Sequence, residues 1–390
     1  MAVRRGAVEG LEVKRDLPFA VSSLSGPFDA LFGGCYIGRR VLVTGHTGFK
    51  GSWLALWLHE MGASVCGLSL AAEGEPNHSR LLDLRHDEAL VDLRGADAVR
   101  SAVQGFAPEI VFHLAAQALV RRGHREPVAT FATNVGGLVH LLEAVRATPS
   151  VRVVVSATSD KCYSNLDTRR GYREDDALGG RDPYSASKAC AEIVSASYRS
   201  SFLSMDDGRG HRVALATARA GNVVGGGDWG EDRLVPDLVR SAAGGDAAVI
   251  RYPGATRPWQ HVLEPLGGYL MLGQRLLADP EGAEGAWNFG PGRSGELSVA
   301  DAIDAFSAHW PAVRCRIDPD PQPQEAALLH LDCTKARSML GWEPVWNAST
   351  TFRRTGHWYR LRHERGELRS RADLHDYVSE ARVRGLAWAA

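Results

Sequence analysis

The chain has 390 residues, of which 44% are hydrophobic and 23% charged, as is usual for a globular protein with one large or two ordinary domains. Its 45 basic and 46 acidic residues nearly cancel, which gives no reason to expect nucleic acid or an anionic membrane as a partner. The six cysteines form no C-x-x-C pair, so we expect neither a disulfide framework nor a metal site.

The first 38 residues differ from the rest of the chain. Basic residues precede a mildly apolar stretch that Pro18, Pro27 and Asp29 interrupt, so a signal peptide is disfavoured. We expect residues 1–38 to be a poorly ordered extension. No later segment approaches the roughly 20 apolar residues of a membrane span. Together with the unpaired cysteines, this pattern favours a cytoplasmic protein without a membrane partner.

From residue 39, short apolar runs alternate with helical patterns. The predicted strands are 41–44, 64–68, 89–93, 110–114, 151–156 and 212–219, and the predicted helices are 53–61, 128–145 and 183–198. This alternation predicts an α/β fold with a parallel sheet that helices cover on both faces. Residues 39–220 would form this domain, to which later segments return. The looser pattern over 221–360 predicts a smaller mixed α/β substrate-binding lobe. The charged composition of 361–390 predicts a solvated helix or tail.

Three glycines, Gly45, Gly48 and Gly51, lie between the first strand and the first helix. Glycine allows a pyrophosphate to approach the backbone N–H groups of a helix N-terminus, where a Cβ would obstruct it. The spacing therefore predicts a Rossmann-type, doubly wound dinucleotide-binding fold. The second strand ends in Gly-Leu-Ser-Leu at 67–70, without an acid for the NAD ribose or an arginine for a 2′-phosphate. This position therefore leaves NAD and NADP open. Asp92 is either a contact of the adenine ring or a turn residue.

Polar side chains with catalytic potential follow the fifth predicted strand. Tyr184 and Lys188 share one face of a predicted helix, one turn apart. A nearby ammonium and a positive nicotinamide ring would lower the pKa of the phenol from its usual value of about 10, so that it could take a proton from a sugar hydroxyl. Ser159, Asp160 and Lys161 add a hydroxyl, a carboxyl and an amine at the sheet edge where α/β folds bind ligands.

Longer motifs narrow the family. They are H-T-G-F-K-G-S-W from His46, S-D-K-C-Y from Ser159, G-G-G-D-W from Gly225 and R-P-W-Q-H-V from Arg257. On these motifs the chain resembles the CDP-glucose 4,6-dehydratases, a branch of the extended short-chain dehydrogenases within the NAD-dependent epimerases and dehydratases. The G-x-x-G, H-L-A-A and Y-x-x-x-K elements are shared more widely. The resemblance covers residues 36–360.

The resemblance implies a tightly bound NAD that is reduced and reoxidised within one turnover, while CDP-glucose loses water to give CDP-4-dehydro-6-deoxyglucose. By similarity, Tyr184, with Lys188 and Ser159, removes the O4 proton. Asp160 would protonate the leaving oxygen and Lys161 would take the C5 proton. A lysine acts as a base only where burial or nearby positive charge lowers its pKa, so the division of roles within this pair stays open.

Further site residues follow from the resemblance by position. The implied cofactor contacts, besides Tyr184 and Lys188, are Gly45, Thr47, Gly48, Phe49, Lys50, Asp92, Leu93, Leu114, Ala115 and Ala116. The implied substrate contacts are Gln117, Asn222, Arg233, Arg251 and Arg257. The arginines are assigned to the diphosphate because guanidinium groups match phosphate oxygens. A homodimer through the helices around 128–145 and 183–198 is expected on the same ground.

Two other functions stay open. A nucleotide-sugar 4-epimerase or reductase on the same fold needs the tyrosine and lysine but no acid–base pair after the serine, so Asp160 and Lys161 argue against it. A non-catalytic dinucleotide-binding protein would be marked by degenerate catalytic residues. Ser159, Tyr184 and Lys188 are all present, which argues against that function.

Overall fold

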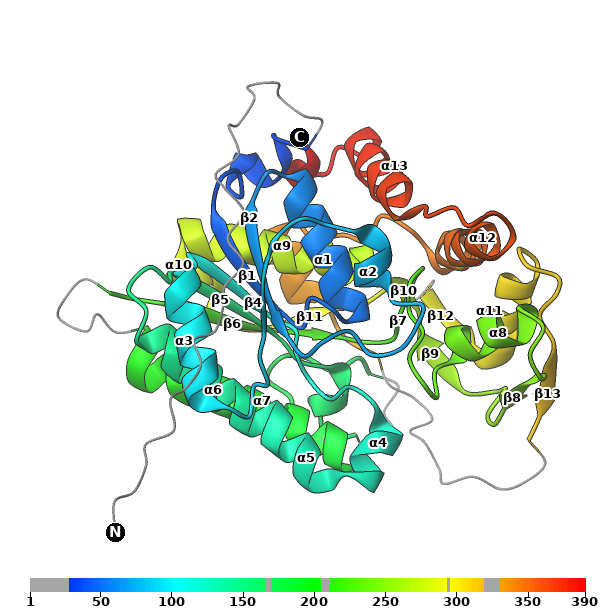
Figure 1. The fold of residues 1–390 in the computed structure, drawn as a ribbon, viewed down its shortest axis with the longest axis horizontal. Coiled ribbons are helices and arrows are strands. Elements are labelled where there is room, and N and C mark those ends of the chain that lie inside the picture. The colour runs from blue at the N-terminus through cyan, green and yellow to red at the C-terminus, as the bar shows by residue number, and fades with distance from the viewer. Residues whose placement is uncertain (1–27, 166–169, 205–210, 293–294, 319–329) are drawn as a thin grey trace, which may run out of the picture.

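The computed structural model describes residues 28–165, 170–204, 211–292, 295–318 and 330–390. At its centre is a seven-stranded sheet of order β11-β6-β5-β4-β1-β2-β3, in which every neighbouring pair is parallel (Figure 1). Its strands are β1 (Arg40–Thr44), β2 (Ser64–Ser69), β3 (Asp87–Leu90), β4 (Ile110–His113), β5 (Val153–Ala157), β6 (Ala214–Ala220) and β11 (Gly285–Phe289). The predicted doubly wound parallel sheet is confirmed.

Helices cover both faces of the sheet. On one face lie α1 (Phe49–Glu60) and α9 (Leu263–Ala278), and on the other α3 (Ala96–Phe106), α6 (Gly137–Arg146) and α7 (Pro183–Tyr198). Val41 and Val43 of β1 enter the first core, and Leu42 between them enters the second. Successive side chains of a strand point to opposite faces. A strand buried on both faces therefore reads as a continuous apolar run, which is the pattern that identified β1 in the sequence.

One long helix also meets the criterion for a membrane span. It runs over Pro127–Arg146, has a mean hydropathy of 1.3 and consists of α5 (Pro127–Phe131), a π-helical turn (Ala132–Gly136) and α6. From the sequence, no such segment is expected. Leu138, Leu141 and Leu142 of this helix are fully buried against the sheet. Because the core helix of a globular domain passes the same test, its length and composition are weak support for a membrane span.

A second group of elements packs at one side of the sheet (Figure 1). It comprises α8 (Leu234–Ala242), α11 (Val299–Ser307), α12 (Ala348–Arg365) and three two-stranded ladders, β7 (Val223–Val224) with β10 (Gln260–His261), β8 (Ala248–Ile250) with β13 (Cys315–Ile317), and β9 (Thr256–Pro258) with β12 (Glu296–Ser298). This second group has its own hydrophobic cluster, which includes Phe306, Phe352 and Trp358. Shorter helices elsewhere are α2 (His78–Leu82), α4 (Val120–Arg125) and α10 (Pro280–Ala283).

The chain before β1 differs from the sequence-based expectation. Residues 1–27 lie outside the described residues, but 28–38 pack onto the domain rather than form a poorly ordered extension. The ring of Phe32 stacks on Trp388, with 5.2 Å between the ring centroids. The hydroxyl of Tyr36 donates a hydrogen bond of 2.6 Å to a backbone carbonyl of α9. The two ends of the described chain therefore share one aromatic cluster.

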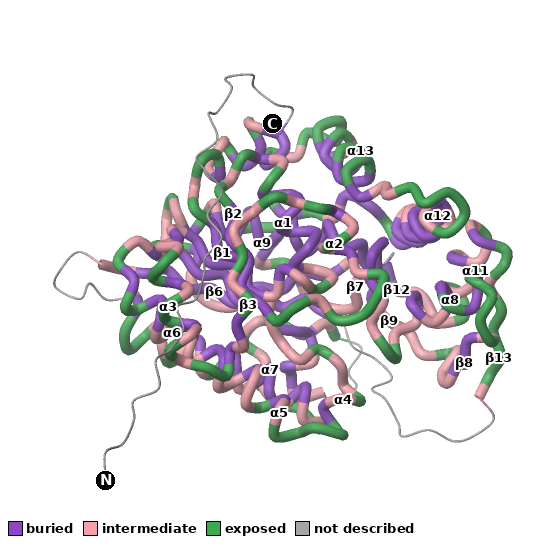
Figure 2. The backbone as a smooth tube through the Cα atoms, viewed as in Figure 1, coloured by how far each residue is buried: buried purple, intermediate pink, exposed green. Residues whose placement is uncertain are grey.

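The charged C-terminal segment takes the helical form, one of the two expected for it, but it is less solvated than expected. It forms α13 (Ser370–Val383), which packs against α1. Its buried apolar residues are Leu374, Tyr377, Val378 and Ala381, and Figure 2 shows this alternation of buried and exposed residues along the helix. This spacing is that of one helical face, and the charged residues occupy the other. High charge in this segment marks the solvated side of an amphipathic helix rather than a tail.

Candidate active site

The glycine-rich loop lies where the strand order reverses, at the carboxyl end of β1 between β4 and β2. Gly45 has a φ of 74°, and a Cβ there would lie 2.8 Å from the backbone of Ala115. A Cβ at Gly51 would lie 2.0 Å from the carbonyl oxygen of Gly45. The first turn of α1 begins at Phe49 without a side-chain cap. Its N–H groups are thus available to an anion, and the loop fits the pyrophosphate of a dinucleotide.

Thr44 joins this loop to the end of β4. Its hydroxyl accepts hydrogen bonds of 3.1 Å from the backbone N–H groups of both Leu114 and Ala115. It also bonds to Nδ1 of His113 at 2.8 Å. Burial, and then the positive charge of Lys188, lower the pKa of His113 to about 3, so this imidazole is neutral at physiological pH. The H-L-A-A motif is therefore fixed beside the glycine loop, where its predicted cofactor role requires it to be.

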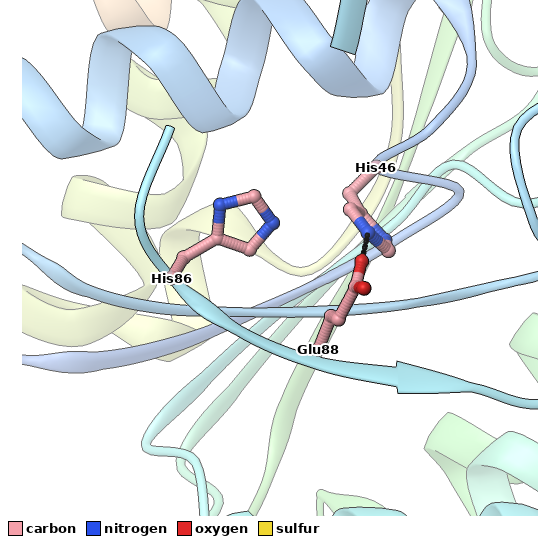
Figure 3. A group of neighbouring side chains, drawn as sticks. All are labelled: His46, His86 and Glu88. Carbon is pink, nitrogen blue, oxygen red and sulfur yellow. Dashed lines mark hydrogen bonds and ion pairs between the residues drawn. The ribbon is translucent and has the colours of Figure 1, made fainter. Parts of the chain in front are cut away.

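His46 in the glycine loop is held from β2 and β3 (Figure 3). Its Nδ1 bonds to the Ser69 hydroxyl at 3.0 Å and its Nε2 to a carboxylate oxygen of Glu88 at 3.3 Å. The ring packs over Gly67, where a Cβ would come within 2.3 Å of it. The glycine in β2 is thus required by the position of the histidine.

His46, Glu88 and His86 together have the donor chemistry of a metal site, with ligand atoms within 4.8 Å of one another (Figure 3). Around a tetrahedral zinc ion, Zn–N distances of about 2.0–2.1 Å place neighbouring ligands about 3.3 Å apart. The His46–Glu88 pair, at 3.3 Å, meets that spacing. The hydrogen bonds of His46 to Ser69 and Glu88 position the glycine loop against the sheet edge.

The end of β5 and the first turns of α7 bring the predicted catalytic residues together. The Ser159 hydroxyl donates to Asp160 Oδ1 at 3.0 Å and accepts from the backbone N–H of Lys161 at 3.2 Å. Burial raises the pKa of Tyr184 to about 12, while contact with Ser159 and the positive charge of Arg233 act in the opposite direction. The phenol is therefore protonated until further positive charge arrives beside it.

Lys188 is buried one turn after Tyr184. Its ammonium donates a hydrogen bond of 3.1 Å to the carbonyl oxygen of Ala157 at the end of β5. Burial lowers the pKa of Lys188 to about 8. This bond fixes α7 to the strand that carries the serine, so the lysine sets the position of the phenol as well as the local charge.

Asp160 is the most enclosed carboxyl of the centre, with 2% of its surface exposed. Burial raises its pKa, although the positive charges of Lys161 and Lys50 and the bond from Ser159 oppose this effect. Its Oδ2 is buried without a hydrogen-bond partner and faces Gly221, where a Cβ would lie 3.1 Å away. Burial without a hydrogen-bond partner favours the protonated form of this carboxyl.

Two cations complete the centre. Burial, followed by the positive charges of Lys188 and Arg233, lowers the pKa of Lys50 to about 8. Arg233 pairs with Asp228, with 2.9 Å between the guanidinium and carboxylate atoms. The sequence analysis assigned Lys50 to the cofactor and Arg233 to the diphosphate. The structure places both charges close enough to act on Asp160 and Tyr184, which are predicted to be catalytic.

A buried ion pair between α7 and β6, which the sequence analysis missed, supports the end of β5. Glu192 of α7 pairs with Arg219 of β6 at 2.8 Å, and each side chain is 3% exposed. The same carboxylate accepts hydrogen bonds from Thr158 and from a threonine of β6. The signal was present in the sequence, because Glu192 continues the helical face of Tyr184 and Lys188 at a spacing of four residues. The Glu192–Arg219 ion pair positions the segment that carries the predicted catalytic residues, and it needs no ligand to do so.

The predicted adenine contacts lie after β3, which ends at Leu90 rather than at 93. Asp92 pairs with Arg94 and accepts a hydrogen bond of 2.9 Å from the backbone N–H of Arg94. The Leu93 side chain is buried against Gly137, and its carbonyl bonds to a histidine of α6. Thr47 bonds to the Ser69 hydroxyl at 3.0 Å, at the strand end that lacks an acid. Ala116 lies half-exposed in the loop after β4.

The predicted substrate residues divide into two groups. Asn222 and Arg257 are near the centre, because Gly221 lies against both Asp160 and Pro258. By contrast, the amide of Gln117 is engaged at both ends, donating to Thr130 at 3.0 Å and accepting from a backbone N–H at 2.6 Å. Arg251 pairs with Asp232 at 3.3 Å. The structure thus gives Gln117 a structural role and leaves Asn222, Arg233 and Arg257 as the nearer substrate candidates.

Comparison with known proteins places this site in a family. The model of the NAD dependent epimerase/dehydratase family matches residues 41–288, from β1 to the penultimate residue of β11. The chain belongs to this family. Its cofactor is therefore NAD, which the glycine loop and the uncapped N-terminus of α1 fit. Bound there, NAD would accept a hydride and, once reduced, donate one, which is the redox chemistry that it supplies in this family.

Individual relatives are similar over most of their length. The chain is 45% identical over 347 residues to a CDP-glucose 4,6-dehydratase of Salmonella typhimurium, covering 88% of this chain and 97% of that protein. It is 30% identical to a UDP-glucose 4-epimerase of Mycolicibacterium smegmatis, covering 78% and 93%. Among solved structures, a UDP-glucose 4-epimerase of Thermus thermophilus in complex with NAD has a TM-score of 0.70 at 26% identity, covering 82% and 99%.

Proposed function

We propose that this family member is a CDP-glucose 4,6-dehydratase, a hydro-lyase that converts CDP-glucose to CDP-4-dehydro-6-deoxyglucose and water. The observation that carries the proposal is the centre itself, in which the buried Asp160 and the half-buried Lys161 stand beside Tyr184. The 45% identity to the Salmonella enzyme supports the same reaction and the same nucleotide. A 4-epimerase needs the tyrosine but no acid beside it.

The tyrosine begins the reaction. Tyr184 takes the proton of the sugar O4 hydroxyl, and Ser159 donates a hydrogen bond to the same oxygen as it becomes a carbonyl. Positive charge lowers the pKa of a phenol, and Arg233 already acts in this direction. NAD supplies the oxidation at C4 and the later reduction at C6. Arg257 and Arg233 bind the diphosphate, which holds the sugar against β5.

The acid and base of the elimination come from the residues after Ser159. Once C4 is a ketone, the C5 proton is acidic, and Lys161 takes it. Asp160 gives its proton to the departing C6 oxygen, which leaves as water. Burial raises the pKa of Asp160, which favours the protonated carboxyl that this role needs, and its unpaired Oδ2 faces the loop of Asn222.

The substrate is tested directly with purified protein and CDP-, dTDP-, UDP- and GDP-glucose in parallel. We expect a 4-keto-6-deoxy product, detected by the alkaline absorbance of its enolate and by loss of water in the mass, from CDP-glucose alone. Interconversion of UDP-glucose and UDP-galactose would assign the epimerase function instead. No product from any sugar, in protein shown to contain NAD, would overturn an enzymatic assignment.

We further propose a homodimer in the cytoplasm, formed through α5, α6 and α7. These neighbouring helices expose large apolar side chains. Val128 is 82% exposed and Ile193 is 57% exposed, and Phe131 extends the same surface. Exposed apolar area on adjacent helices is characteristic of subunit interfaces.

The dimer is tested by light scattering on the wild type and on Ile193→Glu. We expect the wild type to be dimeric and the variant to dissociate, because a buried unpaired carboxylate is costly in an apolar interface. Val383→Glu is the matched control, since Val383 is 89% exposed on α13 and should leave the dimer intact. A monomeric wild type, or a dimeric Ile193→Glu protein, would contradict the proposed interface.

A further inference from the structure

A basic groove of about 390 Å³ lies against α12, on elements that carry none of the predicted site residues. Its charged lining comes from the end of α11, from α12 and from the residue before α13, and consists of His309, Arg353, Arg354, His357, Arg360 and Arg369. This volume is within the range of small-molecule sites, roughly 300–1,000 Å³.

The positive charge of the groove is only partly balanced. Two of its arginines pair with acids of α13; these are Arg354 and Arg369, and the acids are Asp373, Asp376 and Glu380. Within the described residues, Arg353 and Arg360 have no ion-pair partner, and the Nε atom of Arg360 is buried without a hydrogen bond. Two guanidinium groups thus face the groove with their charge uncompensated.

The two histidines report the same positive field. Burial, and then the positive charges of Arg353 and Arg360, lower the pKa of His309. Burial and the positive charges of Arg369, Arg360 and Arg354, with His309, lower that of His357. The largest charge effects on both imidazoles come from positive groups. An anion in the groove would relieve this repulsion, and both imidazoles could donate hydrogen bonds to it.

The opposite face of α12 supports the active-site loop. Trp358 lies against Gly226, where a Cβ would come within 2.1 Å of the indole. The hydroxyl of Tyr359 bonds to the backbone N–H of Asp228 at 2.8 Å, and Asp228 pairs with Arg233. One helix therefore separates the groove from the arginine that acts on Tyr184.

We propose that this groove binds a small polyphosphate anion, either pyrophosphate or the phosphate chain of a nucleotide, at a site separate from the catalytic centre. Paired guanidinium groups match phosphate oxygens in geometry and charge. The two uncompensated arginines suit a ligand that carries at least two negative charges. The site does not depend on the proposed dehydration, because none of its residues contributes to that chemistry.

Calorimetric titration of the NAD-loaded protein with pyrophosphate tests the site. The wild type is compared with the double variant Arg353→Gln, Arg360→Gln and with Arg365→Gln, a control on the same helix whose side chain is 65% exposed and does not line the groove. Each charged contact contributes about tenfold in affinity, so we expect the double variant to bind at least about tenfold more weakly and the control to bind as the wild type does. Turnover of the sugar nucleotide without added anion should be unchanged in both, which verifies folding.

The catalytic centre also has arginines for a diphosphate, so the titration is repeated with the product sugar nucleotide at saturation. Binding that persists there and is lost in the double variant supports the groove. Three results would overturn the proposed groove site. They are unchanged affinity and stoichiometry in the double variant, loss of all binding when the catalytic centre is filled, and no binding by the wild type. Titration with CTP distinguishes a nucleotide from free pyrophosphate as the source of the bound phosphates. Tighter binding than pyrophosphate indicates a nucleotide, and equal binding indicates the phosphate chain alone.

Discussion

Tyr184→Phe is expected to lower kcat with CDP-glucose by about 10²- to 10⁴-fold, the usual contribution of a positioned acid–base group. The phenylalanine fills the same buried volume but cannot take the O4 proton, so oxidation at C4 is the step that fails. In a single turnover, the absorbance of reduced NAD should not appear. Affinity for the sugar nucleotide should stay within a few-fold of the wild type, because the diphosphate is bound elsewhere.

The pH profile of the wild type gives this prediction a second readout. The active tyrosine is the phenolate, and burial raises the pKa of Tyr184 to about 12 before ligands bind. The rate of C4 oxidation should therefore rise with pH up to the value that the phenol takes in the complex. The residual rate of Tyr184→Phe should lack this rise. Wild-type turnover in the variant would remove Tyr184 from the mechanism.

The sheet and the glycine loop were predictable because local sequence determines them. The apolar run before Gly45 is typical of a buried strand, and the spacing of Gly45, Gly48 and Gly51 indicates a close backbone approach. The structure shows both the positive φ and the short Cβ distances that explain these glycines. Helix α7 matches the predicted span of 183–198, since proline at its first turn and the Asp182 cap mark where it begins.

The rest depended on contacts between distant parts of the chain. The charge of Arg233 reaches Tyr184 from a loop 49 positions later in the sequence, and no local pattern predicts this. Tyr377 donates a hydrogen bond of 2.8 Å to Glu264, which ties the C-terminal helix to α9. For 361–390 the sequence left a solvated helix and a tail open, and the buried face of α13 was missed because charge content was weighed there without the helical spacing of its apolar residues.

Asp160→Asn is expected to separate the two halves of the reaction. The amide keeps the shape of the side chain but cannot donate a proton to the leaving oxygen, so elimination should slow by about 10²- to 10⁴-fold. Oxidation at C4 should continue, and reduced NAD should accumulate during a single turnover. Lys161→Ala is the matched comparison, because it also stops after oxidation but removes the base rather than the acid.

Exchange at C5 in deuterated water distinguishes these two variants. Asp160→Asn should still incorporate deuterium at C5 of the trapped 4-ketone, because Lys161 is intact, whereas Lys161→Ala should incorporate little. Equal incorporation in both would move the base role to another residue, and normal elimination in Asp160→Asn would move the acid role.

The stability of Asp160→Asn checks the state of the carboxyl independently of turnover. Since burial raises the pKa of Asp160 in the folded protein, its proton stabilises the fold below the unfolded pKa, and this stability is lost as pH rises through the folded value. Asparagine does not titrate. The variant should therefore unfold at a midpoint equal to or above that of the wild type at neutral pH, with the difference shrinking in acid. The opposite result would be a variant whose stability relative to the wild type is lower at neutral pH than in acid. It would mean that the carboxyl is ionised in the folded protein and that the proton donor lies elsewhere.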